Sequence, residues 1–162
     1  MSQHEPQVQQ REAQPYLAIH AHVTTEAEFR RAADSGFPEL FGWLGEHAIE
    51  PTGPIFIRYG EIDSAGAPRE IELAVPVADG VTGAGRIRAG VLPAGRWATF
   101  VHVGAYRSET ERDLAAGRAT LEAWADAQGL ARGDYVEHYV KGPVEEPDHT
   151  RWETELAYLT TA

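Results

Sequence analysis

The feature that most constrains the fold is an internal duplication that spans most of the 162-residue chain. Blocks of sequence recur in the same order about 80 residues apart, which is typical of two copies of one structural unit. The pairs are Ala18–Val23 with Ala98–Val103, Leu40–Trp43 with Leu121–Trp124, Tyr59 with Tyr139, and Arg69–Val75 with Arg151–Tyr158. A chain of this length can bury one sizeable core, so the duplication predicts one domain made of two repeats.

Periodicity gives both repeats the same order of elements. Runs rich in β-branched and aromatic residues predict strands at Ala18–Val23 and Trp97–Val103. Apolar residues at helical spacing follow, over 37–49 in the first repeat and about 109–128 in the second. Two further strands then come in each repeat, at Ile55–Tyr59 and Ile71–Val77, and at Tyr135–Val140 and Glu153–Leu159. The sequence therefore predicts an α+β fold of two β-α-β-β modules, with antiparallel sheets and the helices on one face.

A single module of this kind leaves one sheet face without a covering layer. Two copies complete one another most simply about a pseudo-twofold axis, and a groove at their junction would suit a small molecule. Residues 1–14 are rich in Gln and Glu and nearly lack apolar side chains, so we expect a mobile tail there. The domain then covers residues 15–162, with repeats at about 15–80 and 86–162.

Composition excludes several classes of protein. The chain has 14 Lys and Arg against 25 Asp and Glu, and this net charge of −11 comes without a basic cluster, which argues against direct binding of nucleic acid. The absence of cysteine excludes disulfides and thiolate metal sites. No apolar run approaches the roughly 20 residues of a membrane span, and no signal peptide begins the chain. We expect a cytoplasmic protein with no membrane partner.

Two acidic positions are equivalent in the duplication. Strand alternation puts Glu72 on the face opposite Ile71 and Leu73, and it puts Glu155 on the corresponding face of the last strand. These faces are either ordinary solvated surfaces or the walls of a cleft. In a cleft, a carboxylate loses solvation and gains by accepting a cation or an acidic proton.

Aromatic residues are dense in the second repeat, where Trp97, Tyr106 and Tyr139 are candidates to line a site. Core packing is the simpler interpretation for Trp124 and Tyr158, whereas Tyr59 and Tyr139 share a repeated position with a polar tip. Aromatic walls around a carboxylate hold flat organic cations by cation–π attraction and ring stacking.

The sequence gives little support for a metal site or a nucleotide-binding site. His20, His22 and His102 could in principle bind zinc, but equivalent positions in different repeats need not converge, and structural roles are favoured. The glycines at 83 and 85 lack the strand-turn-helix context of a dinucleotide fingerprint. We therefore expect neither a metal nor a cofactor.

Several short motifs together resemble those of a known family. Leu92–Gly95 with Trp97, and then His102–Tyr106, resemble a segment of GyrI-like domains, and Glu137–Tyr139 and Trp152–Leu156 resemble two of their later strands. GyrI-like domains bind small molecules and also serve as effector modules of AraC-type and MerR-type drug-sensing regulators. The similarity covers about Pro15 to Thr161, and no helix-turn-helix pattern precedes it, so a stand-alone form is expected.

This resemblance implies a groove that accepts amphipathic, cationic or planar aromatic compounds. In drug-sensing members a glutamate on the last strand is the partner of the cation, and the matching position is Glu155. The expected ligand-binding residues are Glu155, Glu137, Tyr139, Tyr59, Trp97, Tyr106 and Glu72.

Three functions stay open on these grounds, and a stand-alone drug- or toxin-binding protein is the leading hypothesis. The second is a hydrolase that opens the cyclopropane ring of alkylating toxins, with Glu155 or Glu137 as the base and Tyr139 or Tyr59 as the proton-bearing partner. Strand parity makes Glu137 and Tyr139 co-facial, which suits a shared site. The third is a gyrase-inhibitor-like protein interaction.

Overall fold

The computed structural model describes residues 5–60, 69–105, 113–143 and 145–161, and it confirms the α+β class. The chain divides into two compact units. One runs from Glu12 to Ala94, and the other joins the residues up to Arg11 to those from Gly95 onward. Within the described residues, each unit consists of an antiparallel sheet and one α-helix.

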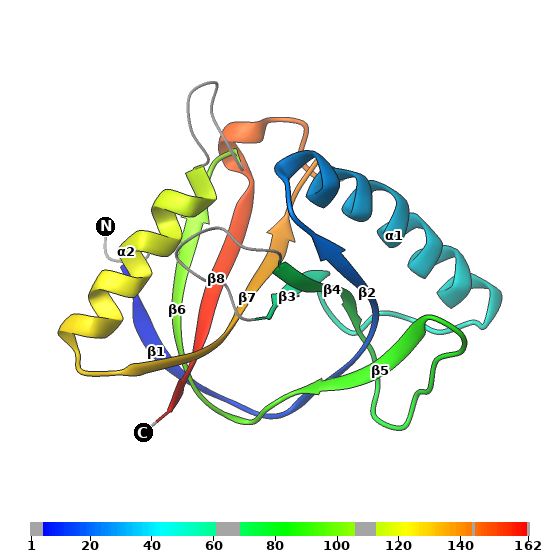
Figure 1. The fold of residues 1–162 in the computed structure, drawn as a ribbon, viewed down its shortest axis with the longest axis horizontal. Coiled ribbons are helices and arrows are strands. Elements are labelled where there is room, and N and C mark those ends of the chain that lie inside the picture. Colours follow the sequence, from blue (N-terminus) through cyan, green and yellow to red (C-terminus); the bar gives the residue numbers. More distant parts are fainter. Residues whose placement is uncertain (1–4, 61–68, 106–112, 144, 162) are drawn as a thin grey trace. The chain divides into compact units, whose positions relative to one another are not determined.

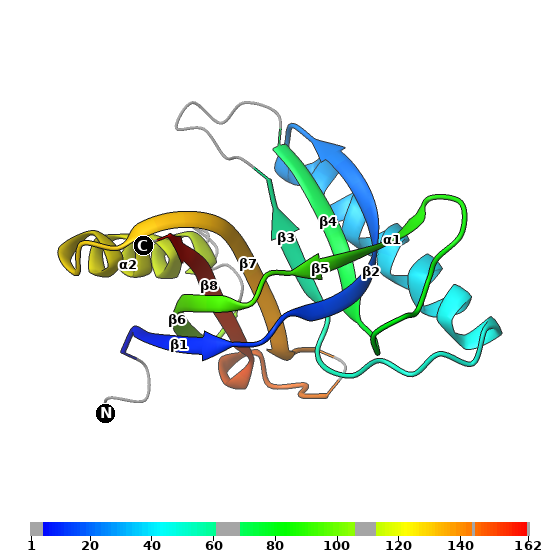
Figure 2. The ribbon, with the colours of Figure 1, turned by 90° about the horizontal axis from the view of Figure 1, so that it is seen from below.

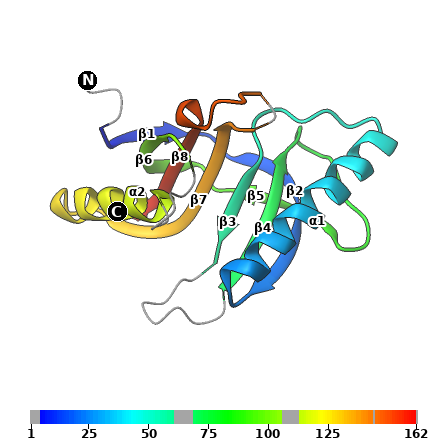
Figure 3. The ribbon, with the colours of Figure 1, turned by 90° about the horizontal axis from the view of Figure 1, so that it is seen from above.

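The Glu12–Ala94 unit contains β2 (Gln14–Val23), α1 (Glu26–Glu46), β3 (Phe56–Tyr59), β4 (Arg69–Pro76) and β5 (Ile87–Leu92). Its strands lie in the order β3-β4-β2-β5, and α1 runs along one face of β2 and β4 (Figures 1 and 3). The core under the helix is aliphatic and is formed by residues of the strands, of α1 and of the segment just after β4. Its buried members are Leu17, Ile19, Leu40, Leu44, Val75, Val77 and Ile87.

The other unit contains β1 (Gln7–Arg11), β6 (Gly95–Val103), α2 (Asp113–Ala127), β7 (Ala131–Lys141) and β8 (Glu153–Thr161), with a 3-10 turn at His149–Arg151. Its strands lie in the order β1-β6-β8-β7 (Figures 1 and 2). Helix α2 packs closely on this sheet at Gly117, where a Cβ atom would lie 3.0 Å from Leu156 Cδ1 and 3.7 Å from the Phe100 ring. Leu156 and Phe100 therefore mark the helix-covered face.

Strand β1 corrects the expectation of a mobile tail for part of residues 1–14. Gln7–Arg11 pairs antiparallel with the start of β6, in a register that sets Val8 opposite Ala98 and Arg11 opposite Gly95. Backbone hydrogen bonds of a ladder do not require apolar side chains, and this is why composition alone misses the strand.

Helix α1 begins well before the predicted 37–49 segment. Thr25 caps its N-terminus by accepting a hydrogen bond from the Glu28 N–H at 3.1 Å, while Glu28 accepts one from the Thr24 N–H at 2.8 Å. The bond to Thr25 satisfies one of the N–H groups that a helix start leaves open, and the bond to Glu28 ties down the residue before the cap. The first turns are mostly polar, so they carry little of the apolar stripe on which the prediction rested.

The second helix ends as predicted. Gly129 has a φ of +72°, and the N–H of Leu130 donates to the Ala125 carbonyl at 2.9 Å. A left-handed residue at this place favours glycine. Among the described residues, neither helix has the length and apolar character needed to cross a membrane.

Two adjacent residues of α1 test which side of the helix packs on the sheet. Leu40 is fully buried, whereas Phe41 is 42% exposed. Leu40→Ala should lower the free energy of unfolding by about 2–5 kcal/mol, because it leaves a cavity in the aliphatic core. Phe41→Ala should cost less than about 1 kcal/mol. Urea unfolding followed by circular dichroism measures both, and equal losses would contradict this packing.

Candidate functional site

Strand β7 gathers a carboxylate and two phenols on one face. Tyr135, Glu137 and Tyr139 alternate along the strand, and their side chains therefore point the same way. The Tyr135 hydroxyl donates to Glu137 Oε2 and the Tyr139 hydroxyl to Oε1, both at 2.8 Å. The expected co-facial arrangement of Glu137 and Tyr139 is thus confirmed.

Glu137 is only 2% exposed. Burying a carboxylate costs several kcal/mol, and each hydrogen bond to a charged group offsets about 1.5–3 kcal/mol of that cost. The two phenols contribute in this way, and their rings also surround the carboxylate with apolar surface. The result is an acidic group shielded from water and bordered by aromatic rings.

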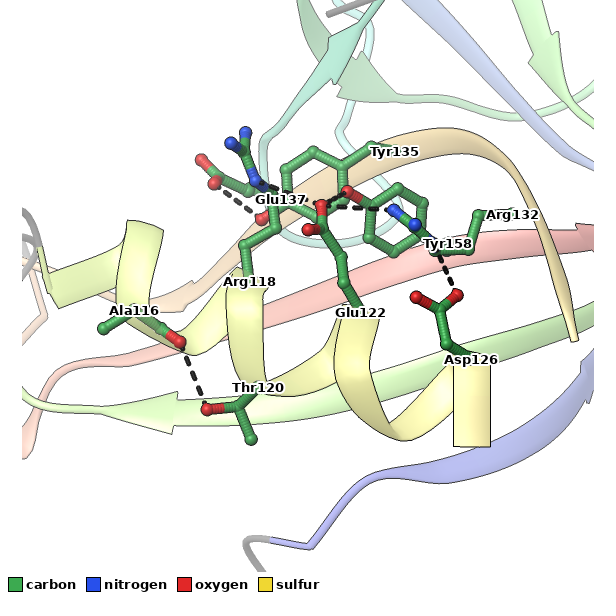
Figure 4. A network of polar contacts seen from close by, with 9 residues as sticks. All are labelled: Ala116, Arg118, Thr120, Glu122, Asp126, Arg132, Tyr135, Glu137 and Tyr158. Carbon is green, nitrogen blue, oxygen red and sulfur yellow. Dashed lines mark hydrogen bonds and ion pairs between the residues drawn. The ribbon is translucent and has the colours of Figure 1, made fainter. Parts of the chain in front are cut away.

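A second phenol–carboxylate pair lies beside the first (Figure 4). The ring of Tyr135 packs on that of Tyr158, with centroids 4.7 Å apart at an interplanar angle of 38°. The Tyr158 hydroxyl donates to Glu122 of α2. Burial raises the pKa of Tyr158, and the hydrogen bond to Glu122 raises it further, so this phenol remains a donor at physiological pH.

Two arginines surround Glu122. Arg118 Nε and Arg132 Nη1 each lie 3.5 Å from Glu122 Oε2, and Arg132 Nε also lies 3.3 Å from Asp126. Both guanidinium groups lie over tyrosine rings. The Arg118 Cζ is 5.6 Å from the centroid of Tyr135, and the Arg132 Cζ is 5.5 Å from that of Tyr158.

Glu155 lies on the other face of the same sheet. In the β7–β8 register Glu137 is opposite Leu156, on the α2 side, while Glu155 is opposite His138. Directly opposed residues of an antiparallel pair point to the same side. The structure therefore does not bring Glu155 together with Glu137 and Tyr139.

Glu155 already has a cationic partner. Arg11 of β1 donates from Nη2 to Glu155 Oε2 at 2.7 Å, and the Glu155 side chain is 18% exposed. His138 Nδ1 lies 3.5 Å from Oε1. Burial lowers the pKa of His138 to about 4, with Glu155 opposing and Arg11 adding to the shift, so His138 is neutral near pH 7.

Glu72 belongs to a different polar group, in the Glu12–Ala94 unit. The buried Tyr16 hydroxyl donates to Glu72 Oε1 at 2.7 Å and accepts from Arg58 Nη1 at 2.9 Å. Burial and the hydrogen bond to Glu72 raise the pKa of Tyr16 to about 12, against the opposing effect of Arg58. Gly90 of β5 leaves room for this ring, since a Cβ there would lie 2.6 Å from Tyr16 Cζ.

The other expected site residues are spread over different surroundings. Tyr59 is buried and stacks on Phe29 of α1, with centroids 6.1 Å apart. Trp97 is buried opposite Leu159, on the face that carries Glu155. Tyr106 lies outside the described residues.

The histidines considered as metal ligands make other contacts. His20 Nε2 and His22 Nδ1 each lie 2.7 Å from the half-exposed carboxylate of Glu70. His102 Nε2 lies 2.8 Å from the Ala105 carbonyl oxygen. In the part of the chain that the structure describes, no group of three or more His, Cys, Asp or Glu residues is arranged to hold a metal.

Sequence reasoning missed the partners that complete these groups. Tyr135 shares the parity of Glu137 and could have been found from that spacing. Arg118 and Glu122 are spaced four apart on a helix, which signals only a surface ion pair, and nothing in the sequence connects them to Tyr135. Arg11 lies 144 positions from Glu155, within the expected tail.

Solved structures share this fold at low sequence identity. The crystal structure of the EcmrR C-terminal domain is 18% identical, with a TM-score of 0.83 over 97% of each chain. SAV2435 bound to tetraphenylphosphonium is 12% identical, with a TM-score of 0.64 over 98% of this chain and 94% of that one. A hydrolase from Listeria innocua is 14% identical, with a TM-score of 0.65 over 98% and 93%.

This chain spans 58% of the longer EcmrR chain in a DNA complex, where the identity is 18% and the TM-score 0.82. A search of curated proteins finds no match. The sequence profile described as the GyrI-like small molecule binding domain matches residues 4–157, nearly the whole chain. With the α+β architecture, this establishes that the chain belongs to the GyrI-like small-molecule-binding domain family.

Proposed function

We propose that this chain binds amphipathic, ring-bearing organic cations, with Glu137 as the charged partner and Tyr135 and Tyr139 as the walls beside it. The observation that carries the proposal is the 2% exposure of Glu137 together with the two phenol hydrogen bonds to its carboxylate. A carboxylate kept out of water attracts a cation more strongly than a solvated one does. The adjoining rings add cation–π attraction and stacking surface.

Glu155 is the weaker candidate on electrostatic grounds. Its ion pair with Arg11, at 2.7 Å, neutralises the charge that a cationic ligand would need. A ligand at Glu155 would have to displace the guanidinium and leave Arg11 without that partner. At Glu137 two phenol hydroxyls donate to the carboxylate, and their rings give a ligand an aromatic surface that the Arg11 guanidinium does not provide.

A related fold gives the proposal a suitable probe. Tetraphenylphosphonium is the compound named with SAV2435, whose structure is similar to this one at a TM-score of 0.64. It combines a delocalised positive charge with four aromatic rings, which is the chemistry that a shielded carboxylate among tyrosines would select.

Glu137→Gln should weaken the binding of tetraphenylphosphonium by about 30-fold or more. Removing one partner of a desolvated charge pair costs about 2–5 kcal/mol, which converts to at least that factor. Isothermal titration calorimetry measures the change.

The matched control is Glu155→Gln, which removes one negative charge from the opposite face of the same sheet. We expect it to change the affinity by less than about threefold, because Arg11 already neutralises this charge and the carboxylate faces away from Glu137. If Glu155→Gln caused the large loss and Glu137→Gln did not, the proposed site would be wrong.

A second candidate is a hydrolase that acts on cyclopropanoid alkylating toxins. The hydrogen bond between Tyr139 and Glu137 favours it, because it joins a base and a proton donor within one group. Water would form a bond to a cyclopropane carbon, the strained C–C bond would break, and its electron pair would move into the conjugated ketone. Glu137 would take the proton from water, and a tyrosine would donate one to the ketone oxygen.

Loss of the dienone absorbance during incubation with catalytic amounts of protein tests this candidate. Glu137→Gln should slow turnover by about 100-fold or more, and Tyr139→Phe by about 10-fold or more, since each removes a proton-transfer group. Glu155→Gln again serves as the control. A dienone that survives equimolar native protein would contradict catalysis while leaving the binding proposal intact.

A further inference from the structure

The ring that would face a cationic ligand already has a cation beside it. Tyr135, whose hydroxyl donates to Glu137, carries the Arg118 guanidinium over its ring, with Cζ 5.6 Å from the centroid (Figure 4). This distance lies within the range of cation–π attraction. Arg118 belongs to α2, and the helix therefore places a guanidinium group against an aromatic ring of the candidate site.

Arg118 is held loosely enough to be displaced. Its side chain is 27% exposed, and its ion pair with Glu122 spans 3.5 Å between residues four apart on the helix. Pairs of this kind contribute little, because solvent screens them and ordering two long side chains costs entropy. Arg132 differs, since it lies between two carboxylates, Glu122 and Asp126, and over Tyr158 rather than Tyr135.

We infer that Arg118 is an internal competitor for cationic ligands and thereby a selectivity residue of this site. The inference rests on the proposed function. A ligand that reaches the Tyr135 ring beside Glu137 must displace the guanidinium or share the ring with it, and either costs free energy. Only cations that regain this loss through their own rings bind well.

This competition defines the class of ligand. Small tetraalkylammonium ions can attract the Tyr135 ring, but they have no rings of their own to stack and so regain less of the free energy lost when the guanidinium is displaced. Polyaryl and other delocalised, lipophilic cations can replace the guanidinium, because their own rings stack on the tyrosines. Arg118 therefore favours ring-bearing cations over small quaternary ammonium ions at a site whose carboxylate alone would attract both.

The test compares two probes, tetraphenylphosphonium and tetraethylammonium, on the native chain and on Arg118→Gln. The variant should bind tetraphenylphosphonium about fivefold more tightly, because the competing cation is gone. It should gain more than this for tetraethylammonium, so that the preference between the probes narrows, and equal gains would overturn the selectivity role. A general loss of structure would weaken binding, so a gain in affinity is not explained by damage to the fold.

Arg118→Lys and Arg132→Gln are the controls. Arg118→Lys keeps a positive charge at the same helix position but not the planar guanidinium, and should therefore keep only part of the native preference. Arg132→Gln removes an equal charge from the neighbouring ring and should give less than half of the Arg118→Gln gain.

The outcomes separate the two proposals. If the native chain binds tetraphenylphosphonium and Glu137→Gln abolishes that binding, but Arg118→Gln leaves the affinity unchanged or lower, the competitor role is overturned and the proposed function stands. If the native chain binds neither probe, the proposed function fails and this inference fails with it. If Arg132→Gln raised the affinity for the probes as much as Arg118→Gln does, the effect would come from the change in net charge alone. That result would also overturn the competitor role.

Discussion

The desolvated carboxylate of Glu137 is the constraint on which the rest of the site depends. Its two phenol hydrogen bonds require Tyr135 and Tyr139 to stand on either side of it along one strand, at alternate positions. Tyr135 in turn packs on Tyr158, whose hydroxyl reaches Glu122 on α2. A single buried charge thus organises a strand, its neighbour and the covering helix into one polar and aromatic group.

The two faces of this sheet treat their glutamates differently. On the α2 side Glu137 is surrounded by phenols, and on the other side Glu155 is paired with Arg11. Both carboxylates have reduced exposure, so burial alone does not distinguish a binding group from a structural one. The rings beside the carboxylate do, because Tyr135 and Tyr139 give a ligand of Glu137 an aromatic surface that the Arg11 guanidinium does not offer at Glu155.

Much of the fold could be predicted from the sequence, since the periods of strands and helices are local features of the chain. Strand parity also predicted that Glu137 and Tyr139 share one face. The missed features depend on long-range pairing or on backbone bonding. Arg11 lies in a segment without apolar signal, and only its strand pairing with β6 brings it to Glu155. The duplication also drew attention to Glu155 through its equivalence with Glu72, although Glu137 is the more deeply buried carboxylate.

The position of a bound cation tests this account most directly. A crystal structure of the chain with tetraphenylphosphonium should have the phosphonium on the α2 side of the β7–β8 pair, with one of its phenyl rings against Tyr135 or Tyr139 and its charge nearest Glu137. The Arg118 guanidinium should have moved off the Tyr135 ring. Density for the cation against Glu155, with Arg11 displaced and the Glu137 group unchanged, would contradict the account.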